Sequence, residues 1–325
     1  MTTPSLTKPG PIVVVGAHVQ SLFMHVERVP RSGETVLGWG YDEPVDGGKA
    51  TNQAIAAARL GAPVAMVAVV GDDRFGEAGI DLLRAEGVET RWLQRWEGRT
   101  DVGFVMLGPD GIPSITTCSD LNRRFDGTVV DDARDAFAGS SVVVCQLEAP
   151  EAVARAAFSL GRSHGAVTIL NPAPAGPVSR DLLELTDVLV PNEHEAGELL
   201  GRDVPTDSLA ASLRDAFAVP TVIVTAGEAG AWLSDARGSA RYPAPRVRVV
   251  DTTGAGDAFI GALATRLRVQ DDLAAAVETS VALASLAVTR PGTIPSFPNR
   301  DDAAVVADHA AVVADHADAQ HEVPR

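Results

Sequence analysis

Short runs of β-branched residues alternate with segments of helical periodicity along most of the chain. The apolar runs, which indicate buried strands, occur at residues 12–15, 64–70, 141–146, 166–170, 187–190 and 221–225. The helical segments occur at residues 47–61, 76–86, 151–161, 179–185, 194–200 and 208–217. Strands and helices that alternate in this way form a parallel sheet with right-handed crossovers and helices on both faces. We therefore predict an α/β fold whose ligands bind beyond the carboxyl ends of the strands.

Two segments break this alternation. Residues 34–45 and 100–117 show polar–apolar alternation that is interrupted by glycine and proline. That pattern is typical of strands with one solvent-exposed face. We expect both segments to form a small β-layer that stands off the main sheet.

The C-terminal segment contains an internal repeat. The sequence Val-Val-Ala-Asp-His-Ala begins at Val305 and again at Val312. Its valines and histidines recur on one helical face, which predicts a terminal amphipathic helix. We do not expect His309 and His316 to bind a metal, because two turns separate them and no carboxylate stands at ligand spacing.

A glycine-rich loop precedes a helix near residue 255. Residues 251–259 read Asp-Thr-Thr-Gly-Ala-Gly-Asp-Ala-Phe, and an apolar periodic run follows at 260–267. Glycine lets main-chain N–H groups approach a ligand, and the N-terminus of a helix favours an anion. Asp257 has two possible roles. It can cap the helix, or it can act as a general base that takes a proton from a substrate hydroxyl beside a bound phosphate.

Composition and charge narrow the possible functions. The chain has 325 residues, 46% of them hydrophobic, so it can bury a large core. Its formal charge of −16 and the lack of a Lys/Arg cluster argue against a nucleic-acid partner. It has two cysteines and no signal-like N-terminus, so we expect a cytoplasmic protein. No apolar run approaches the roughly 20 residues that cross a bilayer, so no membrane partner is expected.

Two common phosphate-binding motifs are absent. Gly48-Lys49 is followed by Ala50 and lacks the earlier glycine of the G-x-x-x-x-G-K-[ST] loop. The Gly-Ala-Gly run at 254–256 lacks the third glycine of the dinucleotide-binding fingerprint. The glycine-rich loop must therefore be interpreted by itself.

Residues 251–259 resemble the C-terminal signature of the PfkB, or ribokinase-like, family of ATP-dependent sugar and nucleoside kinases. The Gly-Gly-Lys-Ala-Thr-Asn-Gln-Ala segment that begins at Gly47 resembles its N-terminal signature. Further motifs appear in the family order at residues 71–76, 146–148, 171–174, 191–196, 288–293 and 295–296. The resemblance covers about residues 12–298.

The resemblance implies a three-layer α/β/α sandwich with a mostly parallel central sheet and a small β-sheet lid. The kinase domain would span residues 1–300, with lid strands at about 34–45 and 100–117. Residues 301–325 would form a C-terminal helix and tail. Family resemblance and the exposed lid strands also favour a homodimer.

The resemblance also implies roles at the phosphate end of the site. Asp257 would be the base, and the amides around Gly254, Ala255 and Gly256 would stabilise the transferred phosphoryl group. ATP would be bound by Asn192, Glu195, Thr225, Gly227 and Gly256. Glu195 would help position Mg²⁺ through water. Asn192 and Glu195 can equally form a helix capping box, and both roles can hold together.

The remaining implied roles concern the acceptor and a cation. The sugar-binding positions would be Ser21, Gly48, Lys49, Asn52, Glu148 and Asp257. A buried Glu148 without a partner would be costly, which favours a binding role. A monovalent cation, K⁺, would be bound largely through carbonyl oxygens by Asp251, Thr253, Arg290, Gly292 and Ser296.

The chain departs from the family pattern where the sugar is bound. The usual Asn-x-Asp after the first strand is Val19-Gln20-Ser21, and residues 118–124 replace the usual Gly-Ala-Asn. Losing a hydroxyl partner should change which sugar is preferred. Candidates to replace the missing acid, which the sequence does not rank, are His18, Gln20, His25 and Asp120.

We predict transfer of the γ-phosphoryl group of ATP to a hydroxyl of a small sugar or polyol, with a ribose-like pentose as the nearest guess. A nucleoside, a ketose, an inositol or a sugar acid is an alternative acceptor. A second alternative is a non-catalytic sugar or nucleotide sensor on the same fold, although a sensor has no need of Asp257 as a base.

Overall fold

The computed structural model describes residues 10–44, 47–109, 113–269 and 272–306. Within these residues, the main sheet has nine strands in the order β13-β12-β11-β10-β9-β8-β1-β4-β5. Their bounds are β1 Ile12–Val15, β4 Val64–Gly71, β5 Leu93–Trp96, β8 Val142–Cys145, β9 Val167–Leu170, β10 Val188–Leu189, β11 Thr221–Thr225, β12 Ala231–Asp235 and β13 Gly238–Tyr242. All neighbouring pairs from β11 to β5 are parallel, whereas β12 and β13 pair antiparallel.

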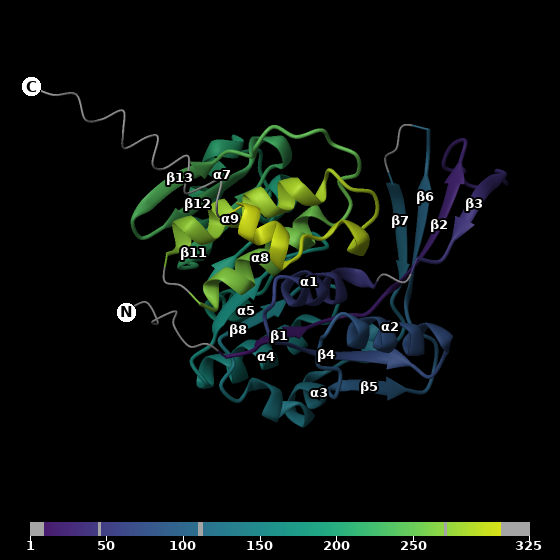
Figure 1. The fold of residues 1–325 in the computed structure, drawn as a ribbon, viewed down its shortest axis with the longest axis horizontal. Helices are drawn as coiled ribbons and strands as arrows, with labels where there is room; N and C mark the ends of the chain where they lie inside the picture. Colours follow the sequence, from purple (N-terminus) through teal and green to yellow (C-terminus); the bar gives the residue numbers. More distant parts are fainter. Residues whose placement is uncertain (1–9, 45–46, 110–112, 270–271, 307–325) are drawn as a thin grey trace, which may run out of the picture.

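Helices cover both faces of this sheet, as the alternation along the chain predicts (Figure 1). One face packs against α1 Gly48–Arg59, α2 Arg74–Ala85, α8 Ala255–Leu267 and α9 Leu273–Ala287. The other packs against α3 Gly127–Asp132, α4 Glu151–Ser163, α5 Arg180–Glu184, α6 Glu193–Leu200 and α7 Thr206–Phe217. Ile12 and Val14 face the first group, and Val13 and Val15 face the second. Burial on both faces explains why the central strands are continuously apolar, and the three-layer α/β/α fold is confirmed.

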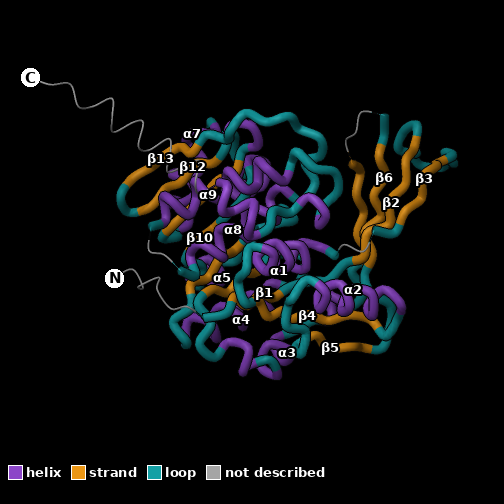
Figure 2. Tube along the Cα trace, viewed as in Figure 1, coloured by secondary structure: helices purple, strands orange, loops and turns teal. Residues whose placement is uncertain are grey.

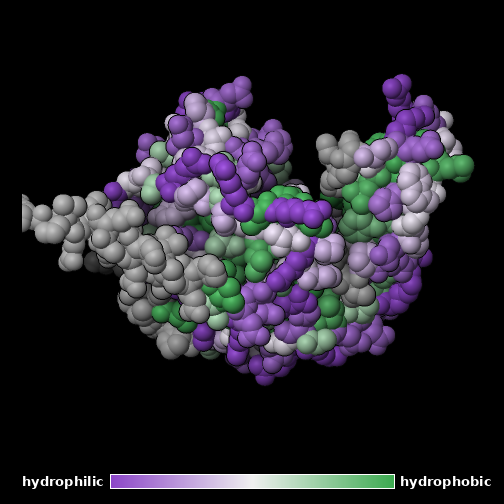
Figure 3. Space-filling model, turned by 45° about the horizontal axis from the view of Figure 1, so that its top comes forward, coloured by the Kyte–Doolittle hydropathy of each residue, from purple (hydrophilic) through white to green (hydrophobic). Residues whose placement is uncertain are grey.

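A second, smaller sheet stands apart from the main one (Figure 2). Its strand order is β3-β2-β6-β7, with β2 Gln20–Val26, β3 Gly38–Asp42, β6 Val102–Leu107 and β7 Pro113–Cys118. The surface is hollowed between this sheet and the helices of the main body (Figure 3). The two predicted lid segments supply β3, β6 and β7, while β2 was not predicted from the sequence.

The ends of the chain add little to the fold. Residues 300–306 are helical, and the rest of the Val/His repeat, from residue 307 onward, lies outside the described residues. The division into a kinase domain and a tail at residue 301 stays a prediction. None of the helices in the described part of the chain is long and apolar enough to cross a membrane.

Candidate active site

The glycine-rich loop leads directly into helix α8. Gly254 precedes the helix with φ 77°, in the left-handed region that favours glycine. A Cβ atom at this position would lie 2.7 Å from Thr293 Cγ2 and 2.9 Å from Phe297 Cε1. At Gly256, by contrast, an added Cβ atom would have no neighbouring heavy atom within 4 Å outside the local helix backbone. The first turn of α8 is therefore packed on one side and open on the other.

Asp257 lies in the first turn of α8, yet its side chain does not cap the helix. Its Oδ2 accepts a hydrogen bond from Asn52 Nδ2 at 3.0 Å, and its Oδ1 accepts one from Gln53 Nε2 at 2.9 Å. Burial raises the pKa of Asp257, although the charge of Lys49 and the two amides act in the opposite direction. Helix capping alone therefore does not account for this carboxylate, which two side chains of the neighbouring helix α1 hold in place.

Lys49 and Glu148 lie beside Asp257. The main-chain N–H of Lys49 donates to Glu148 Oε2 at 2.7 Å. Gly48 has φ 70°, and a Cβ there would lie 3.1 Å from the same oxygen. Burial raises the pKa of Glu148 to about 7. Burial alone would lower the pKa of Lys49, but Asp257, Glu148 and Glu195 raise it above its ordinary value. Lys49 is therefore a cation among three carboxyl groups.

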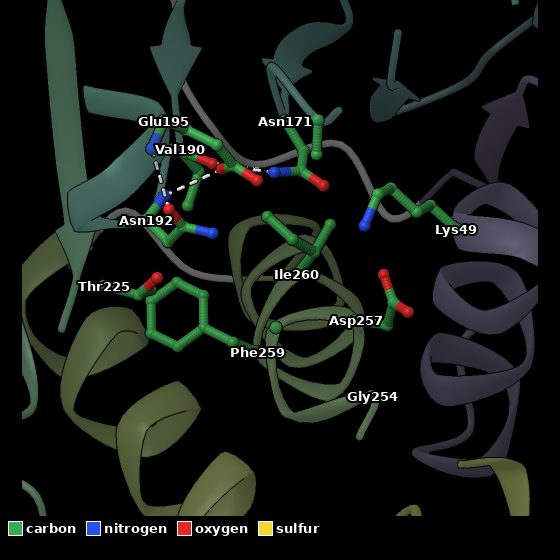
Figure 4. A pocket seen from close by; sticks show the side chains of 12 residues that line it. Lys49, Asn171, Val190, Asn192, Glu195, Thr225, Gly254, Asp257, Phe259 and Ile260 are labelled. Carbon is green, nitrogen blue, oxygen red and sulfur yellow. Dashed lines mark hydrogen bonds between the residues drawn. The ribbon is translucent and has the colours of Figure 1, made fainter. Parts of the chain in front are cut away.

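Asn192 and Glu195 form the capping box of α6. Glu195 N donates to Asn192 Oδ1 at 2.9 Å, and Asn192 N donates to Glu195 Oε2 at 2.8 Å. The capping interpretation from the sequence is thus correct. The amide nitrogen of Asn192 nevertheless points into the pocket (Figure 4). Burial raises the pKa of Glu195. Capping and ligand binding are compatible here, because the box leaves polar atoms of both side chains facing the pocket.

These groups surround one cavity of about 190 Å³. The predicted site residues that line it are Lys49, Asn192, Glu195, Thr225, Gly254, Gly256 and Asp257. The lining residues to which the sequence assigned no role are Asn171, Ala173, Val190, Phe259 and Ile260. Asn171 follows strand β9, so its position beyond a carboxyl end is the signal that points to it. Phe259 and Ile260 carry no such signal, because they read as ordinary apolar positions of α8.

Several predicted residues do not line this cavity. Ala255 and Gly227 are not among its lining residues, and Gly227 begins the 3₁₀ turn Gly227–Ala229. Asn52, Gly48 and Glu148 are connected to the cavity only through Asp257 and Lys49. Gly48 also packs against Val19, because a Cβ there would lie 3.2 Å from Val19 Cβ.

Ser21 is less well connected. It is half-buried on β2, in register with Gly103 of β6. In the part of the chain that the structure describes, no hydrogen bond joins its side chain, or that of any candidate replacement for the missing acid, to Asp257, Lys49 or Glu148. Among the described residues, His18 bonds Thr51, and Gln20 bonds the carbonyls of Ser21 and Pro44.

The residues predicted to bind a monovalent cation form a separate cluster, held together by hydrogen bonds and one ion pair. Asp251 Oδ1 accepts from Thr253 N and its Oδ2 accepts from Gly292 N, both at 2.9 Å. Ser296 Oγ donates to the carbonyl of Thr293 at 2.7 Å. The guanidinium of Arg290 pairs with Asp302 at 2.8 Å. These side chains are engaged with protein partners, so a cation there would depend on main-chain oxygens. The described residues contain no cluster of His, Cys, Asp or Glu suited to a metal.

The chain belongs to the pfkB family of carbohydrate kinases, whose family model matches residues 12–300. Its similarity to individual members is spread over nearly the whole chain. It is 32% identical over 295 residues to the ribokinase of Staphylococcus aureus, covering 88% of this chain and 96% of the relative. It is 33% identical over 293 residues to the deoxyribokinase of Salmonella typhi, covering 89% and 95%.

A solved structure agrees with these relationships. Arabidopsis thaliana ribokinase, described as complexed with ribose and ATP, superposes with a TM-score of 0.84 at 28% identity. The alignment covers 91% of this chain and 98% of that one. The family, the relatives and the fold together identify this chain as an ATP-dependent sugar kinase.

Proposed function

We propose that this kinase transfers the γ-phosphoryl group of ATP to a hydroxyl of a ribose-like pentose or a related sugar, with Asp257 as the general base. The observation that supports the proposal best is the buried Asp257 carboxylate, held by two amides at the N-terminus of α8 and beside Lys49. An acid placed there can take a proton while the helix amides attract phosphate. The names of the relatives, ribokinase and deoxyribokinase, support a pentose.

The proposed reaction is the displacement of ADP from the γ-phosphorus of ATP by a sugar hydroxyl. Asp257 takes the hydroxyl proton of the sugar as the sugar oxygen forms a bond to the γ-phosphorus. The bond from that phosphorus to the bridging oxygen breaks, and ADP leaves with the electron pair. The main-chain amides at Gly254, Ala255 and Gly256 and the ammonium of Lys49 offset the negative charge of the transferred group. Asp257 then releases its proton to solvent.

Ions are part of the proposal. Asn192 and Glu195 fit a hydrated Mg²⁺, because Glu195 offers a carboxylate beside the cavity and capping uses only one of its oxygens. The ion would neutralise phosphate charge. The segment containing Asp251, Thr253, Arg290, Gly292 and Ser296 would hold K⁺ through carbonyl oxygens, since both oxygens of Asp251 already accept amides. Thr225 lines the cavity on the nucleotide side, and Gly227 is proposed to lie farther along the nucleotide.

The small sheet supports a homodimer. Large apolar side chains in or next to it are exposed, namely Leu37, Trp39, Tyr41, Phe104 and Ile115, and Leu37 is 86% exposed. Covering such a surface with a second copy is favourable. Sedimentation equilibrium should give a dimer for the protein and a monomer for the double variant Trp39→Lys, Ile115→Lys. A monomeric parent protein would overturn this part of the proposal. The expected cytoplasmic location stays a prediction.

The acceptor is tested with a panel of candidates in the presence of ATP and Mg²⁺. The panel contains ribose, 2-deoxyribose, fructose, a nucleoside, an inositol and a sugar acid, and transfer of labelled γ-phosphate is measured for each. We expect the highest kcat/KM for one of the two pentoses. Preferred transfer to another class would overturn the pentose assignment. Nucleotide binding without transfer to any acceptor would instead favour a sensor.

A further inference from the structure

Both the nitrogen and the oxygen of the Gln53 side-chain amide make hydrogen bonds to other protein groups. Gln53 lies on α1 and is 1% exposed. Its Nε2 donates to Asp257 Oδ1 at 2.9 Å and to Asn171 Oδ1 at 3.1 Å. Its Oε1 accepts from Gln146 Nε2. Since a carboxamide has two N–H donors and one carbonyl oxygen, Gln53 contacts three different segments at once.

Gln146 fixes the direction of the Gln53 amide. Because Gln146 donates to the oxygen of Gln53, the nitrogen of Gln53 must face Asp257 and Asn171. Gln146 itself is 2% exposed and fits against Gly16, where a Cβ would lie 2.4 Å from Gln146 Oε1. The glycine at the end of β1 therefore leaves room for the residue that orients Gln53.

Asn171 extends the contact toward the nucleotide side. Its Nδ2 donates to the carbonyl of Val190 at 3.0 Å, and Asn192 follows two residues later (Figure 4). Gln53 thus joins the Asp257 carboxylate on α8 to the ends of β9 and β10. These contacts connect segments that are 118 and 204 residues from Gln53 along the chain.

We propose that Gln53 is a positioning residue for phosphoryl transfer, which fixes the Asp257 carboxylate relative to the strand ends that carry Asn171 and Asn192. The proposal rests on the role of Asp257 as the base. Asn52 binds only Oδ2, so without Gln53 a single hydrogen bond is left to resist rotation of the carboxylate about its Cβ–Cγ bond. The charged groups that face Asp257 are Lys49 on α1, Glu148 after β8 and Glu195 on α6. Because the Gln53 N–H donates to the ionised carboxylate, its loss disfavours that form of Asp257, in the same direction as the negative charges of Glu148 and Glu195.

The test is Gln53→Met, which keeps the length of the side chain and removes its hydrogen bonds. We expect kcat to fall on the order of tenfold to a hundredfold, with KM for the sugar nearly unchanged. The acid limb of the kcat–pH profile should move to higher pH, because the ionised form of Asp257 loses a hydrogen-bond donor. In an Asp257→Asn background, Gln53→Met should cost no further activity. An unchanged kcat and acid limb in the folded variant would overturn the proposal.

The matched control is Thr51→Val. Thr51 is the fully buried residue two positions before Gln53 and bonds His18 instead of Asp257. The Thr51→Val variant should be less stable, but the acid limb of its kcat–pH profile should not move. An equal shift of the acid limb in this control would also overturn the proposal. If Gln53→Met does not fold, Gln146→Met should give a smaller shift of the same sign, and its absence counts against the proposal. Retained turnover in Asp257→Asn alone would refute the base role and is distinguishable from failure of the Gln53 role.

Discussion

The two sides of the proposed cleft are built very differently. At the proposed phosphate end, Asp257 is 8% exposed and is held by two side chains of the neighbouring helix α1. At the proposed acceptor end, Ser21 lies half-buried on a strand of the small sheet, and among the described residues its hydroxyl makes no hydrogen bond to the other proposed site residues. The main sheet buries its strands on both faces, while the small sheet exposes large apolar side chains such as Trp39.

In the proposed function, one region of the protein carries out the reaction and another selects the acceptor. Phosphoryl transfer requires groups held in a fixed geometry, which a dense network within a packed body can provide. We propose that acceptor choice depends on a few polar atoms near Ser21 and Val19, where an apolar valine and a hydroxyl stand in place of the Asn and Asp that the family resemblance implies. Chemistry shared by the family and recognition specific to one member can therefore change independently.

The largest expected effect is that of Asp257→Asn. We expect kcat to fall about 10²- to 10⁴-fold, because a carboxamide cannot accept the hydroxyl proton. The new NH₂ group would also face the amide of Asn52 or Gln53, so stability should fall by about 1–3 kcal/mol. Single-turnover transfer of labelled phosphate and urea unfolding measure the two effects. Asp187→Asn is the control, since Asp187 bonds Thr168 where β9 and β10 begin, whereas the cavity is lined by Asn171 and Val190, where these strands end. Turnover near the parent value would exclude Asp257 as the base.

The sequence predicts the main body well because its signals are local. β-branched runs mark β1, β4, β8, β9 and β11, and the predicted helices agree with the observed ones to within about two residues at most ends. Strand β2 was missed because Gln-Ser-Leu-Phe-Met-His-Val does not alternate strictly. Of its two partner strands, β3 and β6, the second is at residues 102–107, far from β2 along the sequence. Long-range pairing of this kind leaves little trace in a local pattern.

The site was predicted in the same uneven way. The glycine-rich loop and Asp257 are recognisable because one continuous segment carries them. Gln53 was not singled out, since its role appears only when Gln146, Asn171 and Asp257 are brought together. Gly227 was expected along the nucleotide; it begins the 3₁₀ turn Gly227–Ala229 beside the cavity-lining Thr225 and is not itself among the lining residues, so its role stays a prediction.

The next largest effect concerns His18, which lies between β1 and β2 where the two regions join. It is fully buried, and burial lowers its pKa from 6.5 to about 4, with Asp73 weakly opposing. Between those values the unfolded chain binds a proton that the folded protein excludes. Stability should therefore decrease as pH falls from 6.5 to 4, by up to about 3 kcal/mol from this group. Urea unfolding across this range measures the slope.

His18→Gln isolates that contribution. It removes the titrating group, so the difference in unfolding free energy between the parent and the variant should change across the same pH window. Glu148, whose raised pKa has the opposite effect on stability, is common to both proteins and cancels in the difference. The exposed His25→Gln on β2 is the control and should leave the slope unchanged. If the difference in unfolding free energy between the parent and His18→Gln does not change with pH, His18 does not destabilise the folded protein in acid.

The smallest effect is expected at the acceptor end, from Ser21→Asp. A carboxylate there adds a charged acceptor for sugar hydroxyls, and such a bond contributes about 1.5–3 kcal/mol. The ratio of kcat/KM for ribose over 2-deoxyribose should rise about tenfold or more, while the acid limb of the kcat profile set by Asp257 stays in place. Thr117→Asp adds the same charge on the same face of the small sheet, two strands away through Gly103, and should leave the ratio unchanged. If Ser21→Asp lowered transfer to both pentoses equally, the acceptor end would be coupled to the catalytic network, and the separation between reaction and recognition would not hold.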